Sequence, residues 1–224
     1  MVKPRVIKTD QGIAGEELTR ARDSSMRSLR HRGWLQTESL LRSRIDLGCA
    51  LEIGPGPGYE GLEWLMRTED TTLKGLDISE DMVVLAKKKA KDYGLNLRAE
   101  YYVGDATRIP FQDGHFDAVF STNSLHEWAH PREVFDEIYR VLRPGGKYFV
   151  SDLRRDMNPL VRWFILLSLS GQPWVMRQGF ISSVNASYTL PEVREMLAQT
   201  ELLGGKTEQT PFYVVISGRK EYNP

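Results

Sequence analysis

Apolar and polar residues alternate in blocks along most of the chain. Short apolar runs predict buried β-strands, and they occur at Cys49–Leu51, Leu73–Asp77, Leu97–Val103, Phe116–Ser121 and Lys147–Ser151. Between these runs, apolar residues recur at three- and four-residue spacing, which predicts helices over Met82–Tyr93 and Val134–Leu142. Strands that alternate with helices in this way predict an α/β protein with a mostly parallel sheet and helices on both faces.

Residues suited to helix ends agree with this pattern. Ser79 is a suitable N-cap before the acidic first turn at Glu80 and Asp81, and Gly94 suits the end of the same helix. A second helix is expected to begin at Pro131 and to end before Pro144.

The pattern also suggests how the chain is divided. Residues 1–44 are expected to form a loose tail, up to about residue 12, followed by helices that act as a lid. Residues 45–224 are expected to form the main domain. Within it, the apolar stretch 156–187 follows the fifth strand, and we expect it to form a helical cap.

Composition excludes several classes of protein. The 224 residues, 41% of them hydrophobic, are enough for one domain with additions, and 30 basic and 30 acidic residues give no formal net charge. Cys49 is the only cysteine, so neither an intrachain disulfide nor a multi-cysteine metal site can form. No signal peptide is visible and the longest apolar run is too short to span a bilayer. We therefore expect a cytoplasmic protein with no membrane partner.

Basic residues cluster only near the N-terminus, at Arg20, Arg22, Arg27, Arg30, His31 and Arg32. A solvent-exposed helix face accounts for such a cluster. A lid that faces an anionic ligand is the alternative.

The segment Glu52–Gly58 is a glycine-rich loop between the first strand and a helix-like pattern, which is a common ligand platform in α/β proteins. Its third glycine comes one position too early for a dinucleotide fingerprint. Pro55 and Pro57 have no N–H groups, so two possible phosphate donors are missing. The loop suits close approach of a ligand to the backbone, with little capacity for phosphate.

Polar residues follow four of the predicted strands. Asp77, Asp105, Asn123 and Asp152 each stand at or just after a strand end, and His126 lies shortly after Asn123. Since ligands of parallel sheets bind beyond the carboxyl ends of the strands, these residues and the glycine loop are expected to surround one site. Asp77, about 20 residues after the loop, is placed where a carboxylate accepts from ribose hydroxyls.

These motifs resemble those of class I S-adenosylmethionine-dependent methyltransferases, of the type 11 methyltransferase-domain group. The likeness covers about Cys49–Asp152, and its other motifs are Gly75–Ser79, Gly104–Ala106, Ile109–Phe111, Phe116–Val119 and Leu142–Lys147. The resemblance implies a Rossmann-like sheet of seven strands with the last one antiparallel. Phe212–Ser217 suits that last strand, and Thr189–Leu197 suits the helix before it.

The resemblance also implies roles for single residues toward S-adenosylmethionine. On the methionine side, Glu52 orders the loop and balances the charge of the ammonium group, and Asn123 offers its backbone carbonyl to that ammonium. The loop glycines, Gly54, Gly56 and Gly58, allow the cofactor to approach the backbone closely. On the adenosine side, the implied cofactor-binding residues are Asp77 for the ribose, Asp105 for the adenine amino group, and Ile78, Met82 and Ala106.

Methyl transfer needs mainly an in-line arrangement of acceptor, methyl and sulfur, so a base is optional. His126 is the candidate base, because imidazole titrates near neutrality. The alternative is a loop histidine that hydrogen-bonds locally. Trp34 and Trp128 are candidates for the acceptor side, with packing in the core as their alternative role.

The predicted function is methyl transfer to a small-molecule acceptor, apolar or aromatic, beneath the cap. The alternatives are an RNA or protein methyltransferase and a non-catalytic S-adenosylmethionine-binding module. The fourth strand lacks the Asn/Asp-Pro-Pro-aromatic pattern of nucleobase amino methylation, which argues against nucleic acid. No acidic cluster resembles a catechol-type metal site, so no metal is expected, while a homodimer remains open.

Overall fold

The computed structural model describes residues 4–7, 12–169 and 174–221, and within these it leaves out the side chains of residues 175 and 176. The described part contains a seven-stranded sheet in the order β3-β2-β1-β4-β5-β7-β6. Neighbouring strands are parallel except that β7 runs antiparallel to both β5 and β6. The strands are β1 (Gly48–Ile53), β2 (Thr71–Asp77), β3 (Ala99–Val103), β4 (Phe116–Thr122), β5 (Leu142–Leu153), β6 (Lys206–Gln209) and β7 (Tyr213–Arg219). The predicted α/β class and the antiparallel last strand are confirmed.

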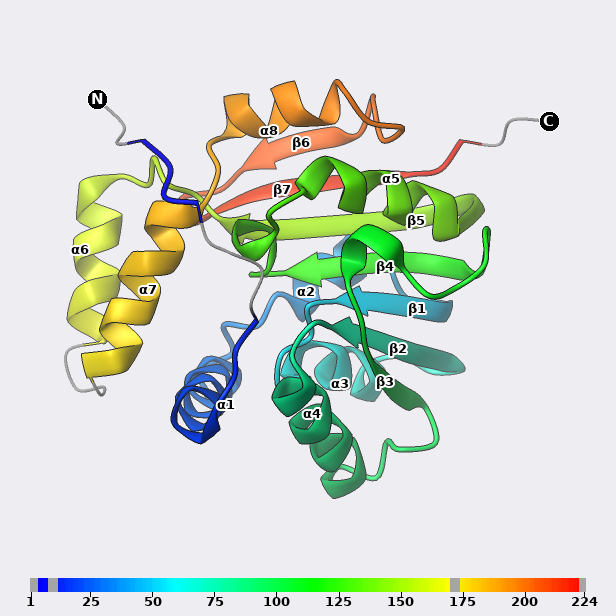
Figure 1. Cartoon of the computed structure of the whole chain (residues 1–224), viewed down its shortest axis with the longest axis horizontal. Coiled ribbons are helices and arrows are strands. Elements are labelled where there is room, and N and C mark those ends of the chain that lie inside the picture. Colours follow the sequence, from blue (N-terminus) through cyan, green and yellow to red (C-terminus); the bar gives the residue numbers. More distant parts are fainter. Residues whose placement is uncertain (1–3, 8–11, 170–173, 222–224) are drawn as a thin grey trace.

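Helices cover both faces of this sheet and one of its ends (Figure 1). They are α1 (Glu16–His31), α2 (Thr37–Arg42), α3 (Tyr59–Met66), α4 (Glu80–Asp92), α5 (Pro131–Val141), α6 (Pro159–Ser168), α7 (Trp174–Ala186) and α8 (Leu190–Leu197), with 3₁₀ turns η1 (Ala106–Arg108) and η2 (Leu125–Glu127). The predicted N-cap is confirmed, because the Ser79 hydroxyl accepts from the N–H of Met82 at 3.2 Å.

Successive residues of the central strands point to opposite faces and so build two cores. In β4, Val119 packs toward α5 and α8, whereas its neighbours Ala118 and Phe120 pack toward α2, α3 and α4. Both cores contain fully buried large side chains, such as Phe135 on one face and Trp64 on the other. A sheet buried on both faces in this way fixes the positions of its strand ends.

The helices expected before residue 44 are α1 and α2, and they are separate because Gly33 adopts a left-handed conformation (φ 67°) just after α1. One predicted strand boundary was wrong. The strand expected to begin at Lys147 begins at Leu142, directly after α5. Its pairing with β4 shifts register between Phe116 and Ala118, so the first residues of β5 pair irregularly.

The expected loose tail also differs from the structure. Residues 1–3 and 8–11 lie outside the described residues, but the part between them is held in place. Arg5 donates from Nε to the carbonyl of Ala186 at 2.6 Å, and the Val6 N–H donates to the carbonyl of Asn185 at 3.0 Å. The N-terminal segment therefore lies against the end of α7.

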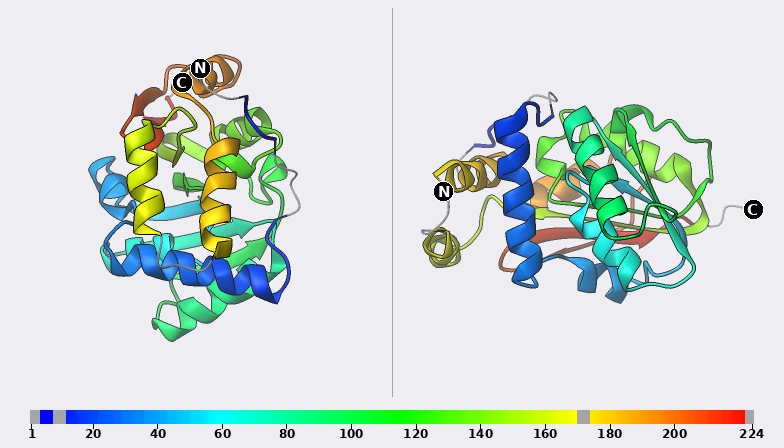
Figure 2. Two further views of the ribbon diagram at one scale, coloured as in Figure 1. Left: turned by 90° about the vertical axis from the view of Figure 1, so that its left-hand side faces the viewer. Right: turned by 90° about the horizontal axis from the view of Figure 1, so that it is seen from below.

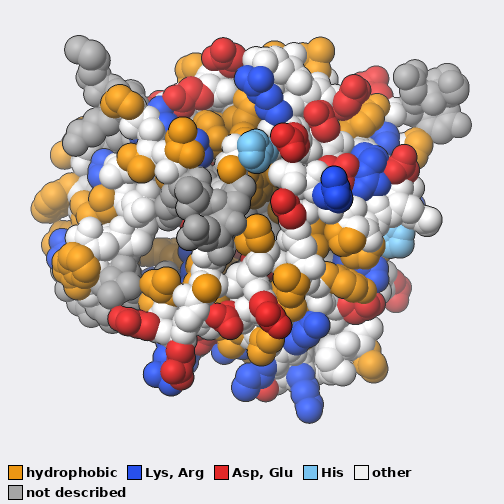
Figure 3. All heavy atoms as spheres, viewed as in Figure 1, with side chains coloured by type: hydrophobic (Ala, Val, Ile, Leu, Met, Phe, Trp, Pro, Cys, Tyr) orange, Lys and Arg blue, Asp and Glu red, His pale blue; other side chains and the backbone are white. Residues whose placement is uncertain are grey.

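The helices α1, α6 and α7 stand at the end of the sheet where the parallel strands finish, at the left of Figure 1, and two further views show α6 and α7 side by side there (Figure 2). Residues 170–173 of the predicted cap lie outside the described residues. No residue of α6 is buried. Hydrophobic side chains accordingly gather at the left edge of the surface (Figure 3).

Candidate functional site

The carboxyl ends of the parallel strands border a cavity. Nine of the predicted site residues line it, from the end of β2, from α4 and from the segments that follow β1, β2, β3 and β4: Gly54, Gly56, Asp77, Ile78, Met82, Asp105, Ala106, Asn123 and Trp128. Glu52, Gly58, His126 and Trp34 do not line this cavity. Three of the four predicted polar strand ends, Asp77, Asp105 and Asn123, therefore meet at one site, whereas Asp152 is buried against His126 and does not line the cavity.

Within the glycine loop, Gly54 and Gly56 have different reasons to be glycine. Both have positive φ, 67° and 53°. A Cβ on Gly54 would lie 2.2 Å from the hydroxyl oxygen of Ser124, so the protein itself occupies that space. A Cβ on Gly56 would have only Arg22 Nε nearby, at 3.9 Å. Gly56 is thus the position where the loop leaves room for a ligand against its backbone.

The Asp77 carboxylate is held by two backbone donors. Its Oδ2 accepts from the N–H of Gly56 and its Oδ1 from the N–H of Ser79, each at 2.9 Å. Burial raises the pKa of Asp77, while these two bonds and the nearby Arg22 oppose that change. Each carboxylate oxygen keeps a second lone pair, so Asp77 can still accept from two hydroxyl groups.

The η1 turn and the N-terminal segment that contains Gly12 and Ile13 also border the cavity. Asp105 caps η1 by accepting from the N–H of Thr107 at 2.8 Å. Ser79 donates its hydroxyl to the carbonyl of Ile13, and the N–H of Gly15 donates to Asp81 at 2.8 Å. The segment therefore forms one wall of the cavity, in which Gly12 lies close to Ile78.

Asn123 and Trp128 form the wall that follows β4. Asn123 has a left-handed backbone (φ 54°), which asparagine tolerates better than most residues, and its N–H donates to the carbonyl of Ser151 at 2.8 Å. Trp128 is buried and donates from its indole N–H to the hydroxyl of Ser124 at 3.0 Å. Its ring packs edge-on against Phe135, with centroids 5.6 Å apart. Trp128 thus gives this wall an apolar surface of fixed orientation beside the polar Asn123.

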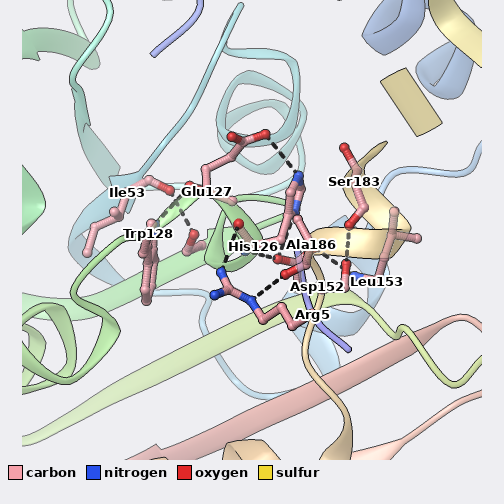
Figure 4. Close-up of polar contacts among 12 residues, drawn as sticks. Arg5, Ile53, His126, Glu127, Trp128, Asp152, Leu153, Ser183 and Ala186 are labelled. Atoms are coloured by element: carbon pink, nitrogen blue, oxygen red, sulfur yellow. Dashed lines mark hydrogen bonds and ion pairs between the residues drawn. The ribbon is translucent and has the colours of Figure 1, made fainter. Parts of the chain in front are cut away.

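His126 is buried behind that wall, between two carboxylates (Figure 4). Its Nδ1 lies 2.9 Å from both oxygens of Asp152, and its Nε2 lies 3.1 Å from Glu127. Burial alone would lower the pKa of His126, but Asp152 and then Glu127 outweigh it and the pKa is raised. Both ring nitrogens are engaged and the protonated form is favoured, so the geometry does not suit a base. It agrees with the alternative of a locally bonded histidine.

Glu127 and Arg22 bring opposite charges to the cavity wall. Arg22 comes from α1 and lies in the field of Glu127, Asp77 and Asp152. Burial lowers its pKa despite these carboxylates. Among the described residues, nothing accepts a hydrogen bond from its buried Nε. A partly buried guanidinium with an unused donor beside Gly56 can bind a carboxylate.

Glu52 lies on the other side of the loop, in the core. It is 2% exposed, and burial raises its pKa well above the ordinary value, with the nearby Glu60 adding to this effect. It is therefore favoured in its neutral form and is not exposed to the cavity. The expected charge balance between Glu52 and a ligand ammonium does not follow from this position.

Glu60 joins the loop helix α3 to α2. Its carboxylate accepts from the Thr37 hydroxyl at 2.6 Å and from the N–H of Gln36 at 2.9 Å. Burial raises the pKa of Glu60 to about 7, against these hydrogen bonds. The start of α2 and the helix after the glycine loop are thus connected through a buried acid.

Trp34 lies outside the site. It is 45% exposed, in the turn after α1, where the Arg32 guanidinium stands 5.1 Å from the ring centroid. Neither the predicted contact with an acceptor nor packing in the core applies to it. The sequence did not reveal that Trp34 lies in the turn between α1 and α2, with its side chain partly exposed.

Several lining residues were not predicted, among them Ile13, Ser124, Glu127 and Thr107. No sequence signal marked these four. Arg22 was included in the basic cluster, and the structure separates it from its neighbours. Arg20 and Arg27 pair with Glu16 and Asp23 within α1 and stay exposed, whereas Arg30 pairs with Glu63 of α3 and is partly buried.

Within the residues the structure describes, no group of three or more His, Cys, Asp or Glu side chains could hold a metal ion. No helix in that same part of the chain is long and apolar enough to cross a membrane.

The lining residues fit S-adenosylmethionine, which carries an ammonium, a sulfonium, a carboxylate and two ribose hydroxyls but no phosphate. Asp77, Asp105 and Glu127 offer carboxylates, Arg22 offers an unused donor, and Gly56 leaves space beside its backbone. The glycine loop contributes few N–H groups, because two of its positions are proline.

Comparison with known proteins agrees with this fit. Residues 51–150 match the family model described as a methyltransferase domain. A phthiotriol/phenolphthiotriol dimycocerosates methyltransferase of Mycobacterium tuberculosis is 36% identical over 124 residues, which are 54% of this chain and 44% of that protein. A ubiquinone/menaquinone biosynthesis C-methyltransferase of Dinoroseobacter shibae is 30% identical over 109 residues, 49% of this chain and 44% of that protein. The matches thus cover about half of this chain and less than half of these relatives.

The fold has solved counterparts. A SAM-dependent methyltransferase from Aquifex aeolicus superposes with a TM-score of 0.63 over 83% of this chain and 90% of that one, at 20% identity. The matched segment and the sheet order agree with each other. Residues 51–150 are similar to the methyltransferase-domain family, and the fold is the Rossmann-like fold of class I S-adenosylmethionine-dependent methyltransferases.

Proposed function

We propose that this protein transfers a methyl group from S-adenosylmethionine to a small-molecule acceptor. The observation that carries the proposal is the cavity at the strand ends, where Gly56, Asp77 and Asp105 meet an apolar wall that includes Trp128. The cofactor supplies an electrophilic methyl group. The protein has to hold an acceptor in line with it and exclude water.

In this proposal, different residues bind the adenosine end and the methionine end of the cofactor. Asp77, oriented by Gly56 and Ser79, accepts from the ribose hydroxyls. Asp105 and Ala106 border the adenine, and Ile78 and Met82 supply its apolar contacts. At the other end, Arg22 donates to the methionine carboxylate.

The acceptor is proposed to enter beside Trp128, Val134 and Glu127, which line the same cavity. The His126 ring lies between two carboxylates: its Nε2 contacts Glu127 and its Nδ1 contacts Asp152. This arrangement makes His126 a positioning residue in place of the expected base. An acceptor whose lone pair is already free needs no base.

A small acceptor is favoured over a macromolecule by the charges of α1. A macromolecular substrate with a phosphate backbone needs a connected basic surface. Here three arginines of the basic cluster already pair with acids: Arg20 with Glu16, Arg27 with Asp23, and Arg30 with Glu63. The two relatives described above are also named for small molecules.

An RNA or protein methyltransferase and a non-catalytic S-adenosylmethionine-binding module are the competing functions. A bound cofactor with no transfer to any metabolite or macromolecule would favour the non-catalytic module. Transfer to RNA or protein alone would favour the macromolecular enzyme. The cytoplasmic location and the homodimer stay predictions.

Calorimetric titration with S-adenosylmethionine and S-adenosylhomocysteine tests the cofactor site first. We expect the wild type to bind both, and Asp77→Ala to lose more than about tenfold in affinity, as the loss of charge-assisted hydrogen bonds implies. Asp77→Asn serves as the control for folding, because its amide oxygen can still accept from a backbone N–H. No binding by a folded wild type would overturn the proposal.

Methyl transfer is then measured by incubating the protein with labelled S-adenosylmethionine and a metabolite extract, with and without nuclease and protease treatment. We expect label in the small-molecule fraction. Label that disappears after nuclease or protease treatment would replace the small-molecule acceptor with a macromolecule.

A further inference from the structure

The helix α6 exposes an apolar face that the described residues do not cover. Leu160, Trp163, Phe164 and Leu167 stand at the helical spacing of one face and are 52–75% exposed. Trp174, at the start of α7, is 70% exposed. Single exposed apolar residues are ordinary on a protein surface, but a contiguous stripe marks a site of interaction.

The helix that carries this face is well formed. Asn158 caps it by accepting from the N–H of Leu160 at 2.8 Å, and Pro159 occupies the first turn. Apart from Arg162 and Ser168, every residue of α6 is apolar, yet none is buried. A helix that is apolar on nearly all sides normally lies in a core or in a membrane environment.

The charge around α6 distinguishes between possible partners. The sequence from Met157 to Pro191 contains no aspartate or glutamate, whereas Arg162 and Arg177 are basic, in a chain with no net formal charge. This local excess complements an anionic surface. A second copy of the same face would bring arginine against arginine, which disfavours a symmetric pair.

The aromatic content of this face points in the same direction. Trp163, Phe164 and Trp174 combine apolar rings with, in the tryptophans, a polar N–H, and such residues concentrate at membrane interfaces. At ten residues, α6 is too short to cross a bilayer but long enough to lie in its surface.

The location of α6 relates this face to the cavity. Its neighbour α7 contacts η2, the turn that carries Glu127 on the cavity wall. Both helices stand at the end of the sheet where the cavity lies (Figures 1 and 2). A surface bound at α6 would therefore lie at the same end of the molecule as the cavity.

We propose that α6, together with Trp174, docks on the surface of an anionic lipid bilayer. The apolar face enters the boundary between headgroups and acyl chains, while Arg162 and Arg177 stay near the headgroups. The expectation of no membrane partner considered only segments that span a bilayer, so it did not test this mode of binding. The proposal does not depend on which molecule is methylated.

Co-sedimentation with vesicles tests the proposal on the full chain without any methyl acceptor. Vesicles of phosphatidylcholine containing about one third phosphatidylglycerol should bind the wild type at least about tenfold better than phosphatidylcholine alone. Trp163→Gln with Phe164→Gln should lower binding to the anionic vesicles at least about tenfold. Arg162→Gln should lower it by about fivefold.

The matched control is Leu97→Gln, because Leu97 is 92% exposed but lies before β3, in a loop outside α6 and α7. It should bind like the wild type. The proposal would be overturned by absent binding to anionic vesicles, or by an equal loss in the control. It would also be overturned if sedimentation equilibrium showed a dimer that the Trp163 and Phe164 substitutions abolish. Cofactor titration is a separate measurement, so failure here leaves the proposed function intact.

Discussion

The glycine-loop rim and the α6–α7 cap lie at the same end of the sheet but are held in different ways. In the rim, Gly54, Asp77 and Ser124 are fixed by close contacts and hydrogen bonds that continue into the buried core. In the cap, α6 has no buried residue, and its most apolar side chains face outward. The rim is held by contacts within the protein, whereas none of the described residues covers the exposed face of α6. Substitutions should therefore have large effects on stability in the rim and small ones in the cap.

Matched glycine substitutions should give the largest contrast. Gly54→Ala places a Cβ 2.2 Å from the Ser124 hydroxyl oxygen, at a positive φ, and should lower the free energy of unfolding by about 2–4 kcal/mol. Gly179→Ala, in α7, meets nothing within 4 Å and should raise it by about 0.5–1 kcal/mol. Urea unfolding of both variants measures the difference. Equal losses would mean that α7 is packed as tightly as the rim.

The buried Glu60 should make the stability of the rim depend on pH. Its pKa in the folded protein is about 7, above the ordinary value of 4.5. At pH values between these two, the carboxyl group keeps its proton in the folded state and loses it in the unfolded state. The stabilisation is complete below about pH 4.5 and is lost as the pH rises through about 7, at a cost of about 3 kcal/mol. Glu60→Gln should remove this component. Unfolding curves from pH 4.5 to 8 test it, and parallel curves for the two proteins would contradict it.

Arg22 should act on one end of the cofactor only. Arg22→Gln removes the proposed donor to the methionine carboxylate, and we expect about 10- to 100-fold weaker binding of S-adenosylhomocysteine. Binding of 5′-methylthioadenosine, which has no amino acid part, should change by less than about twofold, since no carboxylate is lost. Arg20→Gln is the control, because Arg20 pairs with Glu16 on the outer side of α1. Equal losses for both ligands would show that Arg22 shapes the cavity without binding the carboxylate.

The parts of the site that could be predicted from sequence are those that local pattern determines. Strand ends carry polar residues, and the parallel topology brings these ends together, so the places of Asp77, Asp105 and Asn123 followed from chain order alone. The glycine loop was recognisable because its prolines and glycines restrict the backbone at fixed positions.

What could not be predicted depends on side-chain direction and on contacts between distant segments. Glu52 and Gly58 belong to the recognised loop, yet one faces the core and neither lines the cavity. His126 was expected to face the ligand, but Asp152, 26 residues away, draws its ring behind the wall. Arg22 lines the cavity while Arg20 and Arg27 stay exposed, and a charge cluster in the sequence does not show this difference.

The smallest expected effect is in the cap, and it can be compared with an identical substitution in the core. Trp163→Phe should change the free energy of unfolding by less than about 0.5 kcal/mol, because Trp163 is 63% exposed. Trp64→Phe should cost about 1–3 kcal/mol, because it removes the indole donor to the Ile45 carbonyl, 2.7 Å away, from a fully buried site. Urea unfolding without lipid measures both. A loss at Trp163 similar to that at Trp64 would show that the exposed face of α6 already packs against the protein in solution, and it would leave no apolar face free to meet a membrane.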